Sequence, residues 1–465
     1  MTFMHPYMAN AVPALKQAML DAIGASSIAA LFEQIPAEHR LSRPLSLPPA
    51  LRSEAALHQH MTGLLRQSRN CETALSFLGG GCWHHYVPAI CDEIVGRSEF
   101  LTSVWGTPSS DHGRNQAWFE FTSQLGELVD MELVGLPVYS WGCAVGHAIR
   151  MATRLTGRRE VVVPRIIDPD RLSVIRNYCE PADMASHIAV VSAGYDAATG
   201  LLDLQALRQA VSARTAAVYI ENPTFLGTIE TQGHAIAQIA HEAGAEFIVG
   251  VDPISLGVLV PPAAYGADIV VGTTQPLGVP MSCGGGAGGF IASRDEERYA
   301  REYPTLLVSI TGTTEPGEVG FGLSLVHQSS YGSREDGNDW TGNSVYLHAV
   351  ANAVYMALLG PQGFVDLGST IVQRAHYAAG RLAAIPGVSI GFPTGFFKEI
   401  VVRYPGGRSV TEINAVLRQH DIFGGHDLSP DFPELGQSAL FCVTELHTQA
   451  DLDRLAAVLT EVLAR

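Results

Sequence analysis

Lysine is almost absent from this sequence. Its 29 basic residues are two lysines, Lys16 and Lys398, and 27 arginines. A reaction that needs a primary amine, such as Schiff-base formation with a carbonyl compound, therefore has two candidate side chains. Basic residues are also outnumbered, because 46 Asp and Glu residues bring the formal net charge to −17. Binding to nucleic acid or to an anionic membrane needs a basic face, so this charge argues against both classes of partner.

Long apolar runs and paired cysteines are absent as well. No run of about 18 apolar residues occurs, so we expect no transmembrane helix. Residues 1–30 lack the basic and apolar regions of a signal peptide. The seven cysteines form no CxxC pair, and no Cys/His spacing matches a zinc site. We therefore expect a cytoplasmic protein with reduced cysteines and no bound metal.

The hydrophobic pattern indicates the fold class. From about residue 130, short apolar segments alternate with helical ones. Strands are expected at 160–164, 187–192, 216–220, 246–251, 268–271 and 289–292, with helices such as 203–213 and 235–243 between them. Short buried strands separated by helices predict a doubly wound, mostly parallel α/β sheet.

Three parts are expected along the chain. Residues 1–70 predict a helical segment and a proline-rich extended arm, because proline fixes φ and lacks an N–H. Residues 71–345 predict a large α/β domain. For residues 346–465 we expect a linking helix, at 345–359, followed by a small α+β domain with strands at 399–403 and 440–444.

Candidate site residues follow the expected strands, because ligands of such sheets bind at the carboxyl ends of the strands. Asp252 follows the strand at 246–251. A buried carboxylate needs a partner, which here could be a pyridinium nitrogen, an arginine or the backbone amides of a turn. The glycine run 79–81 predicts either a ligand site or tight turns. His85 lies just after it and is a candidate for a pocket or an interface.

Several segments, taken in order, resemble one known family. They are RPLSLPPAL (43–51), SFLGGG (76–81), HYVPA (85–89), RSEFLT (97–102), NPTFLG (222–227), DPISLG (252–257), GADIVVG (266–272) and QPLGVP (275–280). Together they resemble the alpha subunit (subunit 1) of the two-chain glycine decarboxylase, the P-protein of the glycine cleavage system. The resemblance covers roughly residues 30–360.

The resemblance implies the fold-type-I architecture of pyridoxal-phosphate enzymes. In the two-chain enzyme the Schiff-base lysine is on the beta subunit, which pairs with the alpha subunit. The enzyme decarboxylates glycine and passes the aminomethyl group to the lipoyl arm of the H-protein. Here the lysine position aligns with Pro276, and Lys398 falls in the expected small domain, away from the site. We therefore expect no covalently bound cofactor in this chain, and pyridoxal phosphate only through a partner subunit.

Other positions depart from the family pattern. Residues 139–144 are YSWGCA where relatives have YDGATA, and Trp141 adds bulk where a glycine would let a phosphate approach the backbone. Asp168 stands in place of a histidine. The loops 104–113 and 328–339 also differ, and the second is mostly acidic where relatives are basic.

Three hypotheses follow. The chain is an alpha-type subunit that pairs with a beta-type subunit and serves the lipoyl H-protein. Alternatively, the fold is repurposed in a specialised pathway, and the old cofactor cleft binds another small molecule. Its lining is then expected from Tyr139, Trp141, His147, Asn222, Asp252 and Gln275, with His85, His147 and Gln275 as the candidates for catalysis. Thirdly, the chain is a non-catalytic assembly subunit, for example a homodimer.

Overall fold

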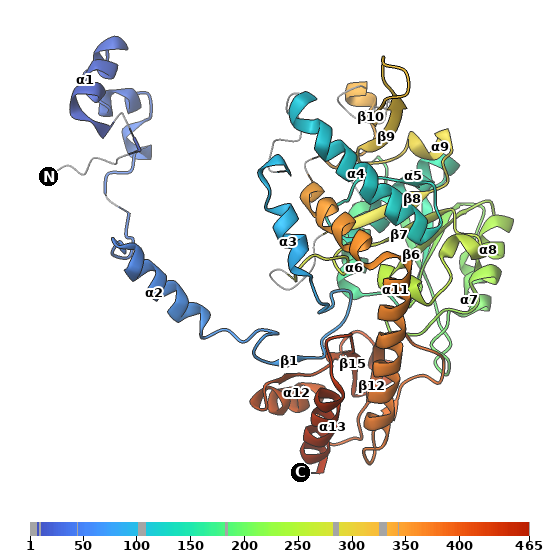
Figure 1. The fold of residues 1–465 in the computed structure, drawn as a ribbon. Helices are drawn as coiled ribbons and strands as arrows, with labels where there is room; N and C mark the ends of the chain where they lie inside the picture. Colours follow the sequence, from blue (N-terminus) through green and yellow to red (C-terminus); the bar gives the residue numbers. More distant parts are fainter. Residues whose placement is uncertain are drawn as a thin grey trace. The chain divides into compact units, whose positions relative to one another are not determined.

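The computed structural model describes residues 7–8, 11–43, 45–100, 108–181, 185–281, 288–324, 333–342 and 344–464, except for the side chains of 108–113. The chain divides into two compact units, Met1–Arg69 and Asn70–Arg465. Figure 1 shows the first unit in the darker blues and the second in colours from lighter blue through green and yellow to red.

The first unit contains two helices and an extended arm. Its helices are α1 (Pro13–Ala22) and α2 (Glu54–Leu65). Two short 3-10 turns, Ala29–Phe32 and Ala37–His39, follow α1. α2 begins after Ser53, whose hydroxyl oxygen accepts a hydrogen bond from the amide of Ala56 and so satisfies one free donor of the first turn.

Neither the arm nor α2 contributes to an apolar core. Residues 45–52 form no helix or strand, as their prolines require. No residue of α2 is buried. Leu57, Met61 and Leu64 are exposed, and their spacing places them on one face of the helix. This unit therefore carries an apolar face that its own residues leave uncovered.

The large sheet of the second unit has seven strands in the order β2-β8-β7-β6-β5-β3-β4. The strands are β2 (Leu133–Val134), β3 (Glu160–Pro164), β4 (Ala189–Ala193), β5 (Thr215–Glu221), β6 (Glu246–Val251), β7 (Ile269–Thr273) and β8 (Gly289–Ser293). The five strands from β3 to β7 run parallel, whereas β8 is antiparallel to β7 and β2 is antiparallel to β8. The predicted doubly wound, mostly parallel sheet is confirmed.

The central strands are buried along their whole length because helices cover both faces. On β6, Phe247 and Val249 belong to one apolar core and Ile248 to the other, as the alternation of side chains in a strand requires. α8 (Gly233–Glu242) packs into the first core and α5 (Trp141–Thr156) into the second. Parallel strands that are covered on both faces need continuous apolar runs, which is the pattern that made them visible in the sequence.

The order in which strands are added to the sheet reverses at β3, because β4 lies on one side of β3 and β5 on the other. The loops that leave β3 and β5 therefore turn opposite ways, and a crevice opens at the carboxyl ends of the strands. This crevice holds the candidate site.

A long helix links the large sheet to a smaller one. α11 (Tyr346–Ala383) runs through a kink at Gly360, whose φ is 58°, followed by Pro361. The predicted end at residue 359 is therefore a kink and not the end of the helix. Figure 1 shows α11 in orange, reaching the sheet of β12 and β15. That antiparallel sheet has the order β11-β12-β15-β14: β11 (Ser389–Ile390), β12 (Glu399–Arg403), β15 (Ser438–Cys442) and β14 (His426–Asp427).

Shorter elements complete the second unit. The other helices are α3 (Ala89–Val95), α4 (Pro108–Val129), α6 (Pro169–Cys179), α7 (Leu204–Ala210), α9 (Glu297–Ala300), α12 (Val410–Gln419) and α13 (Gln449–Ala464). β9 (Leu307–Gly312) and β10 (Val319–Ser324) form a hairpin, and β1 (Leu75–Ser76) pairs with β13 (Ile422–Phe423). Among the helices of the described residues, none combines the length and the apolar character needed to span a membrane.

Candidate functional site

The crevice contains Asp252, at the carboxyl end of β6. Its Oδ1 accepts a hydrogen bond of 3.1 Å from the amide of Ile254 and so caps the short helix Pro253–Gly257. The side chain is 4% exposed. Turn capping was one of the roles open for this residue, but it uses only one of the two carboxylate oxygens.

Lys398 provides the partner of the second oxygen. Its Nζ lies 2.7 Å from Oδ2 of Asp252, and its side chain is 3% exposed. The same Nζ lies 3.0 Å from Nε2 of His85 and 3.4 Å from the centre of the Trp83 ring. The expectation that Lys398 lies away from the site is therefore wrong. Lys398 directly precedes β12, and the start of that strand packs against the crevice.

The glycine run beside the crevice explains how β12 comes so close. The amide of Gly80 donates a hydrogen bond of 2.6 Å to Oε1 of Glu399, the first residue of β12. A Cβ atom at Gly79 would lie 2.3 Å from the same oxygen. Gly80 and Gly81 have φ values of 90° and 97°, which favour glycine. The run thus forms tight turns around a buried carboxylate.

A second buried ion pair stands next to the first. Nη1 of Arg171, on α6, lies 2.5 Å from Oε1 of Glu221, which ends β5, and both side chains are at most 5% exposed. Tyr219 donates a hydrogen bond of 2.9 Å to the same carboxylate. Burial raises the pKa of Glu221, although Arg171 opposes the shift. Neither Arg171 nor Glu221 was predicted as a site residue, since both lie in ordinary helix and strand patterns.

Aromatic rings fill the space between the two ion pairs. Trp141 is buried, with the Arg171 guanidinium 3.8 Å from the centre of its ring. Its indole lies so close to Gly250 of β6 that a Cβ atom there would be 3.0 Å from two ring atoms. Trp83 meets Trp141 edge to face, with 6.2 Å between the ring centres. The remaining cavity is about 20 Å³, which is enough for about one water molecule.

These residues do not fit pyridoxal phosphate. A pyridinium nitrogen was one of the partners expected for Asp252, but the second oxygen of this carboxylate is paired with Lys398. Two indoles and a guanidinium lie in the crevice, and the remaining cavity cannot hold a pyridine ring. Position 276, after β7, is a proline. No reaction step through the cofactor is therefore assigned to this chain.

The other predicted site residues lie outside the crevice lining. Asn222 holds its own loop, because its side chain exchanges hydrogen bonds with the backbone N–H and C=O of Glu230. Gln275 is buried and donates to the carbonyl of Val279. Tyr139 is half exposed and donates to the carbonyl of Gly342. Of the seven candidates, Asp252 and Trp141 line the crevice, and His85 is connected to it through its contact with Lys398.

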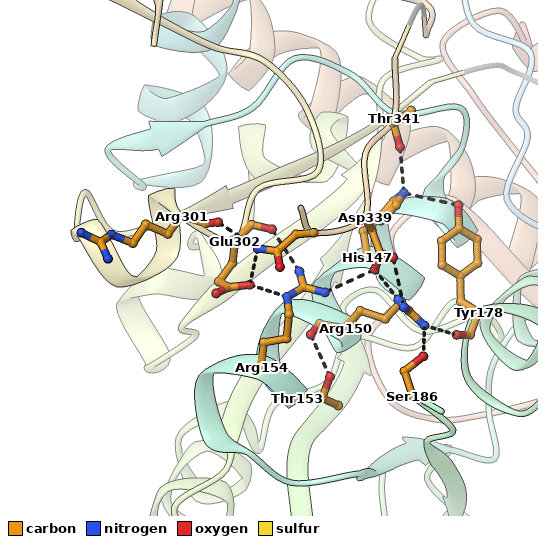
Figure 2. Close-up of polar contacts among 11 residues, drawn as sticks. His147, Arg150, Thr153, Arg154, Tyr178, Ser186, Arg301, Glu302, Asp339 and Thr341 are labelled. Carbon is orange, nitrogen blue, oxygen red and sulfur yellow. Dashed lines mark hydrogen bonds and ion pairs between the residues drawn. The ribbon is translucent and has the colours of Figure 1, made fainter. Parts of the chain in front are cut away.

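The seventh candidate, His147, belongs to a separate polar cluster on α5 (Figure 2). Its Nε2 lies 2.9 Å from Oγ1 of Thr341 and 3.3 Å from the hydroxyl of Tyr178. Burial lowers the pKa of His147 to about 4, so the imidazole is neutral at pH 7. Two turns of the same helix present Arg150 and Arg154 to the loop that contains Thr341.

Asp339 anchors that loop on α5. Its carboxylate accepts two hydrogen bonds from Arg150 and one, of 3.2 Å, from Arg154 (Figure 2). Burial raises its pKa, but the hydrogen bonds and charges of the arginines outweigh this effect and the pKa is lowered. The acidic character predicted for residues 328–339 thus has a structural use at Asp339.

Two predicted features lie partly outside the described residues. Of the altered loop 104–113, only the backbone from 108 onward is described, as the start of α4. Of the loop 328–339, residues 333–339 are described. Across the described ranges, no group of three His, Cys, Asp or Glu side chains is placed to hold a metal ion.

Comparison with known proteins identifies the family. The family model for the glycine cleavage system P-protein matches residues 9–459. A probable glycine dehydrogenase (decarboxylating) subunit 1 from Staphylothermus marinus is 33% identical, over 99% of this chain and 98% of its own length. A crystal structure of glycine decarboxylase (P-protein), in inhibitor-bound form, is 33% identical, with a TM-score of 0.86 and full coverage of both chains.

A more distant structure, a sphingosine-1-phosphate lyase from Burkholderia pseudomallei, shares the fold at 17% identity, with a TM-score of 0.65 over 92% of this chain and 95% of its own. The predicted fold type I of pyridoxal-phosphate-dependent enzymes is confirmed. The chain belongs to the P-protein family of the glycine cleavage system.

Proposed function

We propose that this chain is subunit 1 of a two-chain glycine decarboxylase and pairs with a beta-type subunit that carries the lysine and the pyridoxal phosphate. The observation that carries this proposal is that the crevice contains no lysine amine that is free to form a Schiff base. The residue after β7 that would have to be lysine is Pro276. The amine that does reach the crevice, Lys398, is bound to Asp252. Relatives named subunit 1 that match almost the whole chain support the same role.

In this role the chain contributes structure and surfaces, while the partner carries out the decarboxylation. The exposed apolar face of α2 (Leu57, Met61 and Leu64) and the extended arm at 45–52 are surfaces suited to another subunit. We assign the transfer of the aminomethyl group to the lipoyl H-protein to the assembled pair. Buried free thiols such as Cys91, Cys179 and Cys442 are usual in a reducing compartment, and we place the protein in the cytoplasm.

The crevice favours this role over a repurposed small-molecule site. A cavity of about 20 Å³ between two buried ion pairs leaves no room for a substrate. A homodimer remains a second possible assembly, because the same exposed faces would serve it.

Co-expression with a beta-type subunit tests the proposal. We expect a stable complex of the two chains by size exclusion with mass measurement. We expect exchange of labelled bicarbonate into glycine, in the presence of lipoylated H-protein, only when both chains are present. A beta-type subunit with its own subunit 1 is the positive control. If that control is active while this chain neither forms a complex nor supports exchange, the proposed role is wrong.

Borohydride trapping tests separately whether Lys398 can form a Schiff base. The chain alone is incubated with pyridoxal phosphate, reduced and digested, and the peptide that contains Lys398 is analysed by mass spectrometry. We expect no reduced adduct at Lys398. An adduct there would show that the amine is available for a Schiff base.

A further inference from the structure

Three groups surround the side-chain nitrogen of Lys398 in the crevice. Nζ of Lys398 has the Asp252 carboxylate at 2.7 Å, the Nε2 of His85 at 3.0 Å and the face of Trp83 at 3.4 Å from the ring centre. A carboxylate, a neutral acceptor and an aromatic face are the groups that recognise an organic cation in a dry pocket. All of them are buried.

The acceptor role of His85 is set by its other nitrogen. Nδ1 of His85 lies 2.8 Å from Oε2 of Glu445, and the amide of Tyr86 donates to the second oxygen of that carboxylate. With the Nδ1 proton donated to Glu445, Nε2 is left with a lone pair for the ammonium. The side chains of Asp252, Lys398, His85 and Glu445 thus form a series of polar contacts that begins and ends at a carboxylate.

We propose that Lys398 is an internal ligand of the old cofactor crevice, and that its ammonium takes the place that a protonated ring nitrogen would occupy against Asp252. The crevice is therefore an organic-cation site that the chain fills with its own side chain. Trp83 and Trp141 fill the space of the missing ring. This inference concerns the chain by itself and does not depend on its pairing with a beta-type subunit.

The consequence is that the buried Asp252 carboxylate still needs a positively charged partner when Lys398 is removed. A buried carboxylate without a partner is strongly unfavourable, so removal of Lys398 alone exposes this requirement. The part of lysine that Ala lacks is three methylenes and an ammonium, which corresponds to n-propylammonium. Lys398→Ala should therefore create a pocket for this cation, lined by Asp252, His85 and Trp83.

Chemical rescue tests the inference. We expect Lys398→Ala to melt at a lower temperature than the wild type, and n-propylammonium to raise its melting temperature in a saturable way. Three controls should show no such rise: the wild type with the same salt, Lys398→Ala with neutral 1-propanol, and Lys398→Ala/Asp252→Asn with n-propylammonium. If the salt stabilises the wild type and the variant equally, or if 1-propanol works as well, no cation site exists.

A charge-balanced pair keeps the test decisive if Lys398→Ala does not fold. Lys398→Met preserves most of the side-chain volume but leaves Asp252 without its cation. We expect Lys398→Met/Asp252→Asn to regain most of the melting temperature lost in Lys398→Met, because the uncompensated charge is removed. Additive losses in the double variant would contradict the assignment.

Tryptophan fluorescence provides a third readout. Pyridoxamine phosphate absorbs in the near ultraviolet and has no aldehyde, so it does not react with surface amines. We expect no saturable quenching of the wild-type emission, since Lys398 and the two indoles occupy the crevice. Saturable quenching that disappears in Trp83→Phe would show an open crevice and overturn the inference.

Discussion

Glu445, which contacts His85, makes the stability of the protein depend on pH. Burial raises its pKa, but the hydrogen bonds that it accepts from Nδ1 of His85 and from the amide of Tyr86 outweigh this, and the pKa falls from 4.5 to about 2. Its side chain is 14% exposed, so solvent screens the interaction only partly. Because the folded-state pKa lies below the unfolded one, the ionised carboxylate stabilises the fold above pH 4.5, and this contribution is lost as the pH falls towards 2.

We expect Glu445→Gln to reduce the pH dependence of stability in that window. The lowered pKa corresponds to about 3 kcal/mol, which solvent screening reduces. The measurement is the free energy of unfolding in urea between pH 6 and the lowest pH at which the wild type still folds. Glu461→Gln, on an exposed position of α13, is the matched control. An unchanged slope in Glu445→Gln would contradict the strong coupling to His85.

Gly250 is the residue against which Trp141 packs. A Cβ atom there would lie 2.5 Å from the Tyr219 hydroxyl and 3.0 Å from the Trp141 ring. We expect Gly250→Ala to lower the free energy of unfolding by about 1–3 kcal/mol through overpacking. Gly380→Ala is the control, since a Cβ atom at that α11 position meets nothing within 4 Å, and it should be neutral or stabilising. Equal effects of the two substitutions would mean that the crevice has spare room.

At the scale of elements, α5 and the loop 333–342 depend on each other. Arg150 and Arg154 hold Asp339 in place, and Thr341 bonds His147 on the same helix (Figure 2). The helix that begins at Trp141 is thus held against the loop that contains Asp339 and Thr341. Two segments that are remote in sequence are joined by these contacts.

We expect Asp339→Asn to loosen this loop, because an amide cannot replace the bidentate ion pair with Arg150. Hydrogen exchange of peptides that cover 333–342 should speed up, while exchange in β6 stays unchanged. Asp336→Asn, an exposed position of the same loop, serves as the control. Similar exchange rates in wild type and Asp339→Asn would show that the loop is held by other contacts.

Much of the secondary structure could be predicted from the sequence. β3, β6 and β12 have the predicted ends, because fully buried strands are short apolar runs with polar or turn residues around them. The site could be predicted only in part. Asp252 follows such a strand, but its partner Lys398 and the contact of His85 with it join segments up to 313 residues apart. Packing between two sheets leaves no periodic signal, so neither Lys398 nor Arg171 could be placed in the crevice.

At the scale of the whole molecule, the two units differ in how they use apolar residues. The second unit buries large cores on both faces of its main sheet. The first leaves Leu57, Met61 and Leu64 of α2 exposed. An apolar face of this kind is typical of a surface that another chain covers.

We expect Leu57→Glu/Met61→Glu to weaken association with a beta-type subunit by at least about tenfold, since two buried leucine-sized contacts are worth more than 1.4 kcal/mol. The Kd is measured by titration of the purified chains. The melting temperature of the isolated chain should not change, because α2 has no buried residue. His58→Glu adds a charge at an exposed polar position of the same helix and is the control. An unchanged Kd in the double variant would exclude this face from the interface.

The ammonium of Lys398 against Asp252 also bears on the order of assembly in the cell. We expect a chain whose own side chain fills the crevice to reach its final state without a vitamin-derived molecule. We expect its folding yield and lifetime to be the same in cofactor-starved and cofactor-replete cells. Under the proposed pairing, we expect such a chain to accumulate first and a newly made beta-type subunit to dock on it.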